Sequence, residues 1–354
     1  MVAETRLPLL ARLWMYQAER FPLRRHGPLI AVFCGAAALY GARLVAGTPS
    51  LPVLLSAILC SGAFFPLMRI ADEFKDRHDD RRCRPYRPVP RGLVSLRELA
   101  LLALALALLQ LTLVGLIAPQ AGGLLLLSWF WFALMTVEFL VPTWLRARPL
   151  LYTLSHMVIV PLIALLAVAM AVLPNGGALP GSALAPLLAL CYVNGLAIEF
   201  ARKIRRPELE EPGVETWSAL WGPGPARERW MAVLLLSLPL ALAAAAPIQA
   251  LPLVAPLLLP LLAWIVLRFG PRPGSGPIRA ARTATTAAEG GANAGWSARG
   301  LAAAGGQEAN GLGSAAAGAA QAARPEPLEL PTALWTLTTY LALGWLPPLL
   351  GGLR

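Results

Sequence analysis

Long apolar runs, each close to the length that crosses a bilayer, recur along this chain of 354 residues. A membrane-spanning helix needs about 20 mostly apolar residues to cover the hydrocarbon core. Nine stretches meet that need, so we expect an all-α, polytopic membrane protein with nine transmembrane helices. The expected spans are Leu29–Ala46, Leu51–Ile70, Leu99–Ala118, Leu124–Val141, Leu150–Leu173, Ala183–Phe200, Met231–Ala246, Leu251–Leu267 and Pro331–Leu350.

The composition excludes an ordinary soluble domain. Charged residues make up 14% of the chain, against about 25% in soluble proteins. A net charge of +11 would suggest nucleic-acid binding in a soluble protein, but the basic residues here gather in a few loops between apolar runs. The positive-inside rule accounts for that arrangement without a polyanion, so we expect no nucleic-acid partner.

The basic loops also predict the orientation of the chain. Five arginines precede the first span, and the loops after the second, fourth, sixth and eighth spans carry eight, two, six and six Lys or Arg residues. The alternate loops carry almost none. This pattern predicts that the N-terminus and the basic loops are cytoplasmic, and we expect the membrane to be the inner membrane of a bacterium.

The remaining segments complete the expected organisation. The four cysteines form no CxxC pair, which leaves zinc and redox motifs unsupported. The stretch 270–330 is rich in Ala, Gly, Ser and Pro, so we expect a disordered cytoplasmic loop. We expect an amphipathic interfacial segment over 1–27, eight helices over 28–269 with motif loops 72–97 and 201–229, and a ninth helix over 331–354.

All the aspartates of the chain fall within nine residues, where the second span should meet the cytoplasm. If the helix continues outward, Asp72, Asp76 and Asp80 recur every fourth residue and share one face, with Glu73 beside them. Magnesium prefers oxygen ligands and is often held by one or two carboxylates together with substrate phosphates. The cluster therefore predicts a magnesium–diphosphate site, and the alternative is a solvated helix end paired with its own basic neighbours.

A proline-rich segment follows the acidic cluster, from Arg84 to Gly92. Its closely spaced prolines exclude a helix and favour a stiff, extended loop. The loop carries Arg84, Arg87 and Arg91, whose planar guanidinium groups match phosphate oxygens. We interpret it as a diphosphate-binding loop, or else as a rigid turn carrying positive-inside charge.

The end of the sixth span is the second candidate region. Glu199 lies at the inner end of a membrane helix, where an ionisable group marks a functional site by default, and Lys203 and Arg205 follow it. Glu138 lies within the fourth expected span and either lines the same cavity or reaches for the surface. His156, in the fifth span, is either a base or a satisfied buried histidine.

The first motif and the loop after it resemble the UbiA superfamily of intramembrane prenyltransferases. That family has nine membrane helices and aspartate-rich motifs after the second and sixth. Its first motif is typically Asn-Asp-x-x-Asp-x-x-x-Asp, followed five residues on by Pro-x-Arg-Pro-x-Pro-x-Gly. Asp80 is followed at that distance by Pro85-Tyr-Arg-Pro-Val-Pro-Arg-Gly92. Counting back aligns Glu73, Asp76 and Asp80 with the three acids, and Asp72 with the asparagine.

The second motif departs from the family pattern. The family shows Asp-x-x-Asp-x-x-x-Asp before Gly-x-x-Thr, and Gly213-Val-Glu-Thr216 is kept here. Arg202, Arg205 and Leu209 stand where the acids are expected. The chain therefore resembles a divergent branch of the family, and we expect Lys203 and Arg205 to bind diphosphate directly in place of a second metal site.

The resemblance implies a UbiA-like helical bundle that moves an isoprenyl group from a prenyl diphosphate to a lipophilic or aromatic acceptor, with Mg²⁺ as cofactor and membrane lipid as surroundings. Alternatives are a non-catalytic polyprenyl-lipid binder, a terpene cyclase of the same fold, and a transporter; transporter sites, however, lie near the midplane. The implied roles are catalysis by Asp72, Asp76, Asp80 and Lys203, diphosphate binding by Lys75, Arg84, Arg87, Arg91 and Arg205, and Mg²⁺ ligation by Asp72, Glu73, Asp76, Asp80 and Glu199.

Overall fold

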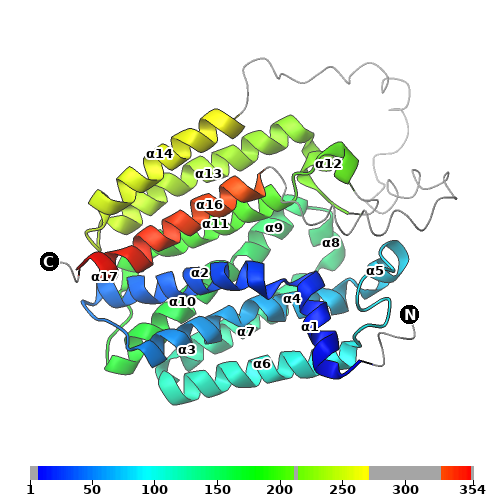
Figure 1. Ribbon diagram of the computed structural model, residues 1–354, viewed down its shortest axis with the longest axis horizontal. Coiled ribbons are helices and arrows are strands. Elements are labelled where there is room, and N and C mark those ends of the chain that lie inside the picture. The colour runs from blue at the N-terminus through cyan, green and yellow to red at the C-terminus, as the bar shows by residue number, and fades with distance from the viewer. Residues whose placement is uncertain (1–6, 211–213, 271–327, 352–354) are drawn as a thin grey trace.

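The computed structural model describes residues 7–210, 214–270 and 328–351, and within these ranges every regular element is helical. The long helices run side by side in one bundle (Figure 1). They are α2 (Leu23–Leu44), α3 (Leu51–Gly62), α4 (Phe64–Lys75), α6 (Leu96–Ile117), α7 (Gly122–Thr136), α9 (Pro149–Met157), α10 (Ile159–Val172), α11 (Ala185–Arg202), α13 (Pro223–Ala245), α14 (Leu251–Phe269) and α16 (Glu329–Tyr340).

Short elements connect these helices. Four of them gather at one end of the bundle, on the right of Figure 1, which we call the charged end: α1 (Leu9–Arg20), α5 (Arg77–Cys83), α8 (Pro142–Arg146) and α12 (Trp217–Trp221). The others are η2 (Pro119–Ala121), η3 (Glu138–Leu140), η4 (Leu173–Asn175), η5 (Gly181–Leu184), η6 (Pro207–Leu209), η8 (Leu341–Trp345) and α17 (Leu346–Gly351).

Seven helical segments of the described chain are long and apolar enough to cross a membrane, which makes the fold a polytopic helical bundle. They are Leu23–Leu44, Leu51–Lys75, Leu96–Ile117, Pro149–Val172, Gly181–Arg202, Pro223–Ala245 and Leu251–Phe269. The expected count of nine is not confirmed. The fourth expected span contains α7, a helix of only 15 residues, and in the ninth the π-helical η8 separates α16 from α17.

The interior of the bundle centres on α10, most of whose residues are buried against α2, α3, α7 and α11. Small residues let other helices approach closely. A Cβ added to Gly344 would overlap Ala36, and one added to Gly35 would overlap the Trp345 ring. The C-terminal helical segment therefore packs directly on α2, as small residues allow in membrane bundles.

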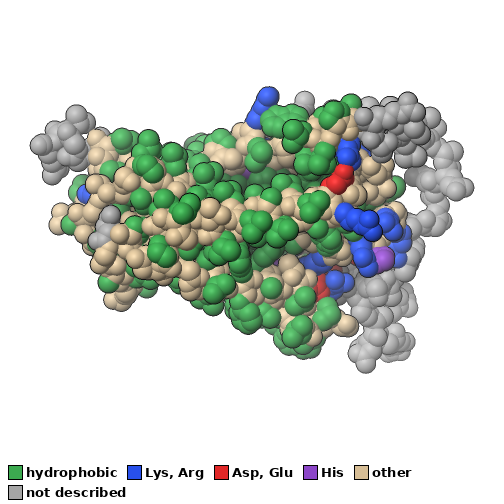
Figure 2. Space-filling view, turned by 90° about the horizontal axis from the view of Figure 1, so that it is seen from below, with side chains coloured by type: hydrophobic (Ala, Val, Ile, Leu, Met, Phe, Trp, Pro, Cys, Tyr) green, Lys and Arg blue, Asp and Glu red, His purple; other side chains and the backbone are tan. Residues whose placement is uncertain are grey.

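The outside of the bundle is apolar along its length. In Figure 2 most of the visible charged side chains gather at one end, while hydrophobic side chains are spread along the rest of the face. Leu101, Leu104 and Leu108 of α6 are all exposed, and only 11% of the most apolar window of α6 is buried. Such a helix is stable only where lipid replaces water around it.

Helix α1 lies at the charged end. Its Tyr16 is buried against Ile70, Leu93 and Val94, whereas Leu10 and Trp14 of the same helix are exposed. The interfacial position, the cytoplasmic side and the bacterial membrane stay predictions. Most of the expected disordered loop, residues 271–327, lies outside the described residues.

Candidate functional site

The acidic motif lies at a bend in the chain. We expected one helix through Asp80, but α4 ends at Lys75 and α5 begins at Arg77, with Asp76 at the junction (φ −88°, ψ 4°). That prediction is wrong, although the backbone bonds Asp76 N–H to Asp72 O and Asp80 N–H to Asp76 O are both 2.8 Å. The helical hydrogen bonds thus continue across the bend, while the side chains of Glu73 and Asp80 are each held by other parts of the chain.

Glu73 points away from the other acids, toward α1. Its side chain is 1% exposed, and Arg20 Nε lies 2.6 Å from Glu73 Oε1. Arg69 Nε lies 3.9 Å from the same oxygen. Two cations thus compensate this buried carboxylate and tie α1 to α4.

Asp80 is bound by the proline-rich loop. Both of its carboxylate oxygens lie 2.7 Å from Arg87 Nη1, and Oδ1 lies 3.1 Å from Arg84 Nη1. Arg91 reaches Glu19 of α1 through two bonds of 2.6 and 2.7 Å. Each arginine of the proline-rich loop that was expected to bind diphosphate therefore already binds a carboxylate of the protein.

The glycine that ends this loop is required by its backbone. Gly92 has φ of 82°, in the left-handed region that glycine adopts without a steric penalty. The turn returns the chain to Ser95, which caps α6 together with Glu98. The proline-rich loop therefore has a fixed backbone conformation around Asp80.

Asp72 and Asp76 are the acids that remain available. Asp72 is 47% exposed, and its Oδ2 lies 3.4 Å from Arg69 Nη2. The half-buried Asp76 side chain makes no hydrogen bond or ion pair within the described part of the chain. Burial raises the pKa of Asp76, and the nearby charge of Asp72 raises it further, although Lys75 and Arg69 act in the opposite sense.

These positions decide how far the chain fits a magnesium ion. Among the residues described, no three His, Cys, Asp or Glu side chains lie close enough together to hold a metal. Magnesium needs only one or two carboxylates when substrate phosphates supply further oxygens. Asp72 and Asp76 fit that requirement, whereas Glu73, Asp80 and Glu199 are each held by basic side chains.

The end of α11 brings the second motif to the same place. Glu199 accepts from Arg202 Nη2 at 2.7 Å, and Lys203 Nζ lies 3.1 Å from its other oxygen. Arg202 is close enough to Asp72 for their charges to interact. The ends of α4 and α11 therefore lie near each other at the charged end.

The loop after α11 is organised by hydrogen bonds to the Glu210 carboxylate. Thr216 and Ser218 both donate to the Glu210 carboxylate, at 2.6–2.8 Å. Ser218 Oγ also accepts from the Arg205 backbone N–H at 2.8 Å. Arg205 itself lies in this loop, with its Nη1 3.5 Å from Leu209 O.

A network that we did not predict lies beneath the first motif. Lys75 donates a hydrogen bond to the Tyr152 hydroxyl, and its Nζ lies 3.1 Å from Glu138 Oε1. Arg146 holds Glu138 through two bonds of 2.8 and 2.9 Å. Glu138 is 2% exposed and therefore lies beside the site instead of reaching the surface. The sequence signal for this network was Glu138, an acid inside an apolar run.

Aromatic rings extend this network into the bundle. The Tyr152 ring lies under Lys75 Nζ, 4.8 Å from it, and stacks on His156 at 3.9 Å between ring centroids. His156 Nδ1 lies 2.8 Å from Tyr152 O, and its buried Nε2 has no hydrogen-bond partner within the described ranges. Its role as a base stays a prediction.

The second-motif loop also approaches the network. Burial raises the pKa of Glu215, and the charges of Lys203 and Arg146 oppose that shift. Arg146 lies at the end of α8 and Lys203 directly follows α11, so charges from both of these elements act on Glu215. The structure thus gathers acids and bases from α4, η3, α8, α9 and α11 at the charged end.

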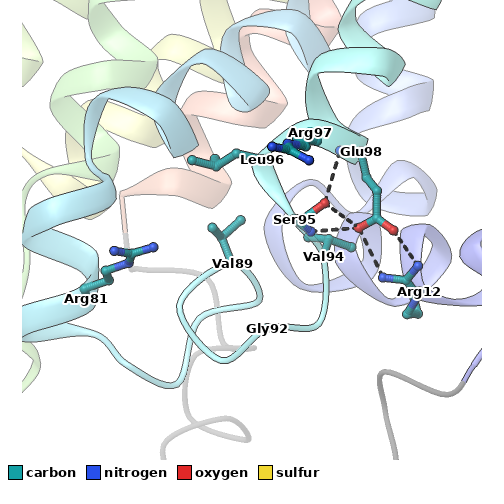
Figure 3. A pocket seen from close by; sticks show the side chains of 9 residues that line it. All are labelled: Arg12, Arg81, Val89, Gly92, Val94, Ser95, Leu96, Arg97 and Glu98. Atoms are coloured by element: carbon teal, nitrogen blue, oxygen red, sulfur yellow. Dashed lines mark hydrogen bonds and ion pairs between the residues drawn. The ribbon is translucent and has the colours of Figure 1, made fainter.

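A separate cavity of about 490 Å³ opens beyond the proline-rich loop (Figure 3). It contains none of the expected metal ligands. Its lining comes from α1, α5, the proline-rich loop and the start of α6: Arg12, Arg81, Val89, Gly92, Val94, Ser95, Leu96, Arg97 and Glu98.

Comparison with known proteins gives one match. A family model described as the UbiA prenyltransferase family matches residues 46–280. No curated protein and no solved structure matches the chain. The matched span includes both motif regions and the helices from α3 to α14.

Proposed function

The chain belongs to the UbiA prenyltransferase family, and on that premise we propose that it moves an isoprenyl group from a prenyl diphosphate to a lipophilic acceptor in a Mg²⁺-dependent reaction. The acceptor is a lipid-soluble or aromatic molecule that reaches the site from the membrane. The allylic C–O bond breaks, its electron pair leaves with the diphosphate, and the acceptor forms the new bond and gives up a proton.

One observation carries the proposal: the acid pair Asp72 and Asp76 lacks full compensation at the charged end of an apolar bundle. Asp76 has no ion-pair partner among the described residues, and burial raises its pKa. A site that holds two carboxylates in this state is prepared for a cation. Bound there, Mg²⁺ would supply the positive charge that neutralises a leaving diphosphate.

Basic side chains of the chain would bind the same diphosphate. Lys203 directly follows α11 and lies 3.1 Å from Glu199, and Lys75 is fixed between Tyr152 and Glu138. Their charges would stabilise the negative charge that develops as the C–O bond breaks. The apolar bundle would hold the isoprenyl tail and exclude water from the cation that forms.

A second candidate, a non-catalytic polyprenyl-lipid binder, is favoured by the second motif. Arg202 pairs with Glu199, and Arg205 lies in a loop organised by Glu210. This side of the site thus offers cations where the family offers acids. A cyclase, which would release diphosphate without any acceptor, is the further alternative.

The test is release of diphosphate by the purified full chain with Mg²⁺, prenyl diphosphates of several lengths and a membrane-lipid extract as acceptor. We expect release that Asp76→Asn reduces about 100-fold or more, because an interaction with developing charge is lost. Asp79→Asn is the matched control, since Asp79 is 69% exposed and its ion pair within the described chain is with the equally exposed Arg82.

The results of this assay distinguish the transferase from the lipid binder and from the cyclase. No release from any donor favours the binder, and release that needs no acceptor favours the cyclase. If Asp76→Asn releases diphosphate at the wild-type rate, the assignment of Asp76 to the site is wrong, even if the chain is an enzyme.

A further inference from the structure

The cavity beyond the proline-rich loop is positively charged and only partly apolar (Figure 3). Its volume of about 490 Å³ falls in the range of ligand-binding cavities. Val89, Val94 and Leu96 give it apolar walls, while Arg81 and Arg97 stand on either side of Val89 in the view of Figure 3.

The lining keeps two positive charges without compensation. Arg12 is neutralised by Glu98 through two bonds, of which Nη1 to Oε2 is 3.1 Å. Arg81 and Arg97 are exposed, and neither has an ion pair or hydrogen bond through its side chain in the described chain. The cavity therefore presents two free guanidinium groups to whatever enters it.

The position of Arg97 makes an anion more favourable still. It lies in the first turn of α6, which begins at Leu96. A cation there opposes the positive end of the helix dipole. A bound anion would be attracted by the guanidinium and by the positive end of the helix dipole together.

The surface next to the cavity is suited to acyl chains. α6 starts at the cavity and runs into the apolar region with Leu101, Leu104 and Leu108 exposed, at 65%, 54% and 54%. On the other side, Leu10 and Trp14 of α1 are exposed at 80% and 55%. Charge at one end and apolar surface alongside is the pattern that an amphiphile matches.

We propose that this cavity binds the phosphate headgroup of an anionic phospholipid on Arg81 and Arg97, while the acyl chains lie along the exposed leucines of α6. The site is distinct from the acid pair, because Asp72 and Asp76 do not line it. It does not depend on the proposed reaction. The lipid would fasten α1, the proline-rich loop and α6 together at the level of the headgroups.

The experiment uses the full chain purified in detergent and stripped of lipid. Phosphatidylglycerol, phosphatidylcholine with the same acyl chains, and inorganic phosphate are titrated separately. Retained lipid is measured by native mass spectrometry, and the thermal unfolding midpoint is followed in parallel. We expect phosphatidylglycerol to be retained and to raise the midpoint, and the other two to do neither at equal concentration.

The variant Arg81→Gln/Arg97→Gln should weaken phosphatidylglycerol binding about 30-fold, since each basic residue near anionic lipid contributes a comparable share of the attraction. Arg82→Gln is the matched control, because Arg82 lies on the same short helix, is 69% exposed and pairs with Asp79. The single variants Arg81→Gln and Arg97→Gln, each with an unchanged midpoint in pure detergent, guard against misfolding.

Two outcomes would overturn the proposal. An equal loss in Arg82→Gln would mean that general surface charge attracts the lipid. Binding of inorganic phosphate as tight as that of phosphatidylglycerol, removed by the same pair of substitutions, would make the cavity a site for free phosphate.

Discussion

The ionised side chain of Asp76 lowers the stability of the fold, although the proposed reaction needs it. Its folded-state pKa is raised, first by burial and then by the charge of Asp72. The folded protein thus holds the proton more tightly than the unfolded chain does, so the ionised carboxylate destabilises the fold above that pKa. The destabilising contribution of Asp76 should therefore decrease as the pH falls from neutral through its raised pKa.

Asp76→Asn should therefore stabilise the protein at neutral pH while it lowers the rate of diphosphate release. The gain should be about 0.5 kcal/mol, the upper end for a like-charged pair four residues apart. The measurement is the thermal unfolding midpoint against pH, in which the variant and the wild type should converge under acidic conditions. A variant that is less stable than wild type at neutral pH would contradict the account, and Asp79→Asn should change nothing.

Glu73 presents the opposite case, because its charge is fully used by the fold. Arg20→Ala leaves the buried Glu73 with the more distant Arg69 alone, and Glu73→Ala leaves Arg20 without its carboxylate, so each should cost about 3 kcal/mol. The double variant Arg20→Met/Glu73→Met should recover most of that loss, because it removes both charges. The thermal unfolding midpoints of the three variants measure this contribution. A Glu73→Ala variant as stable as wild type would show that the Arg20–Glu73 ion pair does not stabilise the fold.

At the scale of residues, the sequence predicted the type of chemistry better than the partners. The clustered aspartates and arginines were identifiable from spacing alone. The partner of Glu73, however, is Arg20, which lies 53 residues away in the chain, and no local pattern predicts that pairing. Glu138 was left open for the same reason, since Lys75 reaches it only through the packed fold.

At the scale of elements, the turn η3 is the most strained part of the described chain. Glu138, Phe139 and Leu140 all have positive φ, between 50° and 63°. The left-handed region costs a residue with a Cβ about 1–2 kcal/mol. The turn directs Glu138 toward Lys75 and Arg146, so the strain maintains the network beneath the first motif.

Leu140→Gly should relieve part of this strain and raise stability by up to about 1 kcal/mol, because glycine adopts positive φ freely. Leu116→Gly is the matched control: it is also 76% exposed but lies in α6, where glycine costs about 1 kcal/mol. Thermal unfolding in detergent should show the two changes with opposite signs. A loss of stability in both variants would mean that the contacts of the Leu140 side chain outweigh the strain of its backbone.

The sequence predicted helices better than their interruptions. The expected span Leu99–Ala118 lies close to α6 at Leu96–Ile117, because a long apolar run has few other ways to satisfy its backbone in lipid. The bend at Asp76 and the turn at Glu138 contain neither glycine nor proline, the residues that normally mark such breaks. Both breaks lie at the candidate site, where tertiary contacts override local preference.

At the scale of the whole molecule, close packing between α2 and the C-terminal helical segment closes the bundle. Gly344 faces Ala36, and Gly35 faces Trp345, whose indole N–H donates to Val32 O at 3.0 Å. Lipid gives helices little hydrophobic reason to associate, so van der Waals contact between small residues holds them together. The contact joins residues more than 300 positions apart in the chain.

Gly344→Ala should therefore destabilise the whole bundle. The added methyl group would overlap Ala36, and overpacking of this kind costs about 1–3 kcal/mol. Gly115→Ala, in α6, has nothing within 4 Å of the added Cβ and should be neutral or stabilising by up to about 1 kcal/mol. The comparison is made by thermal unfolding in detergent and by limited proteolysis. We expect only Gly344→Ala to lose stability. Cleavage should then appear in both α2 and the C-terminal segment, because each of these segments supports the other. If Gly344→Ala unfolds at the wild-type temperature, the two helices do not close the bundle.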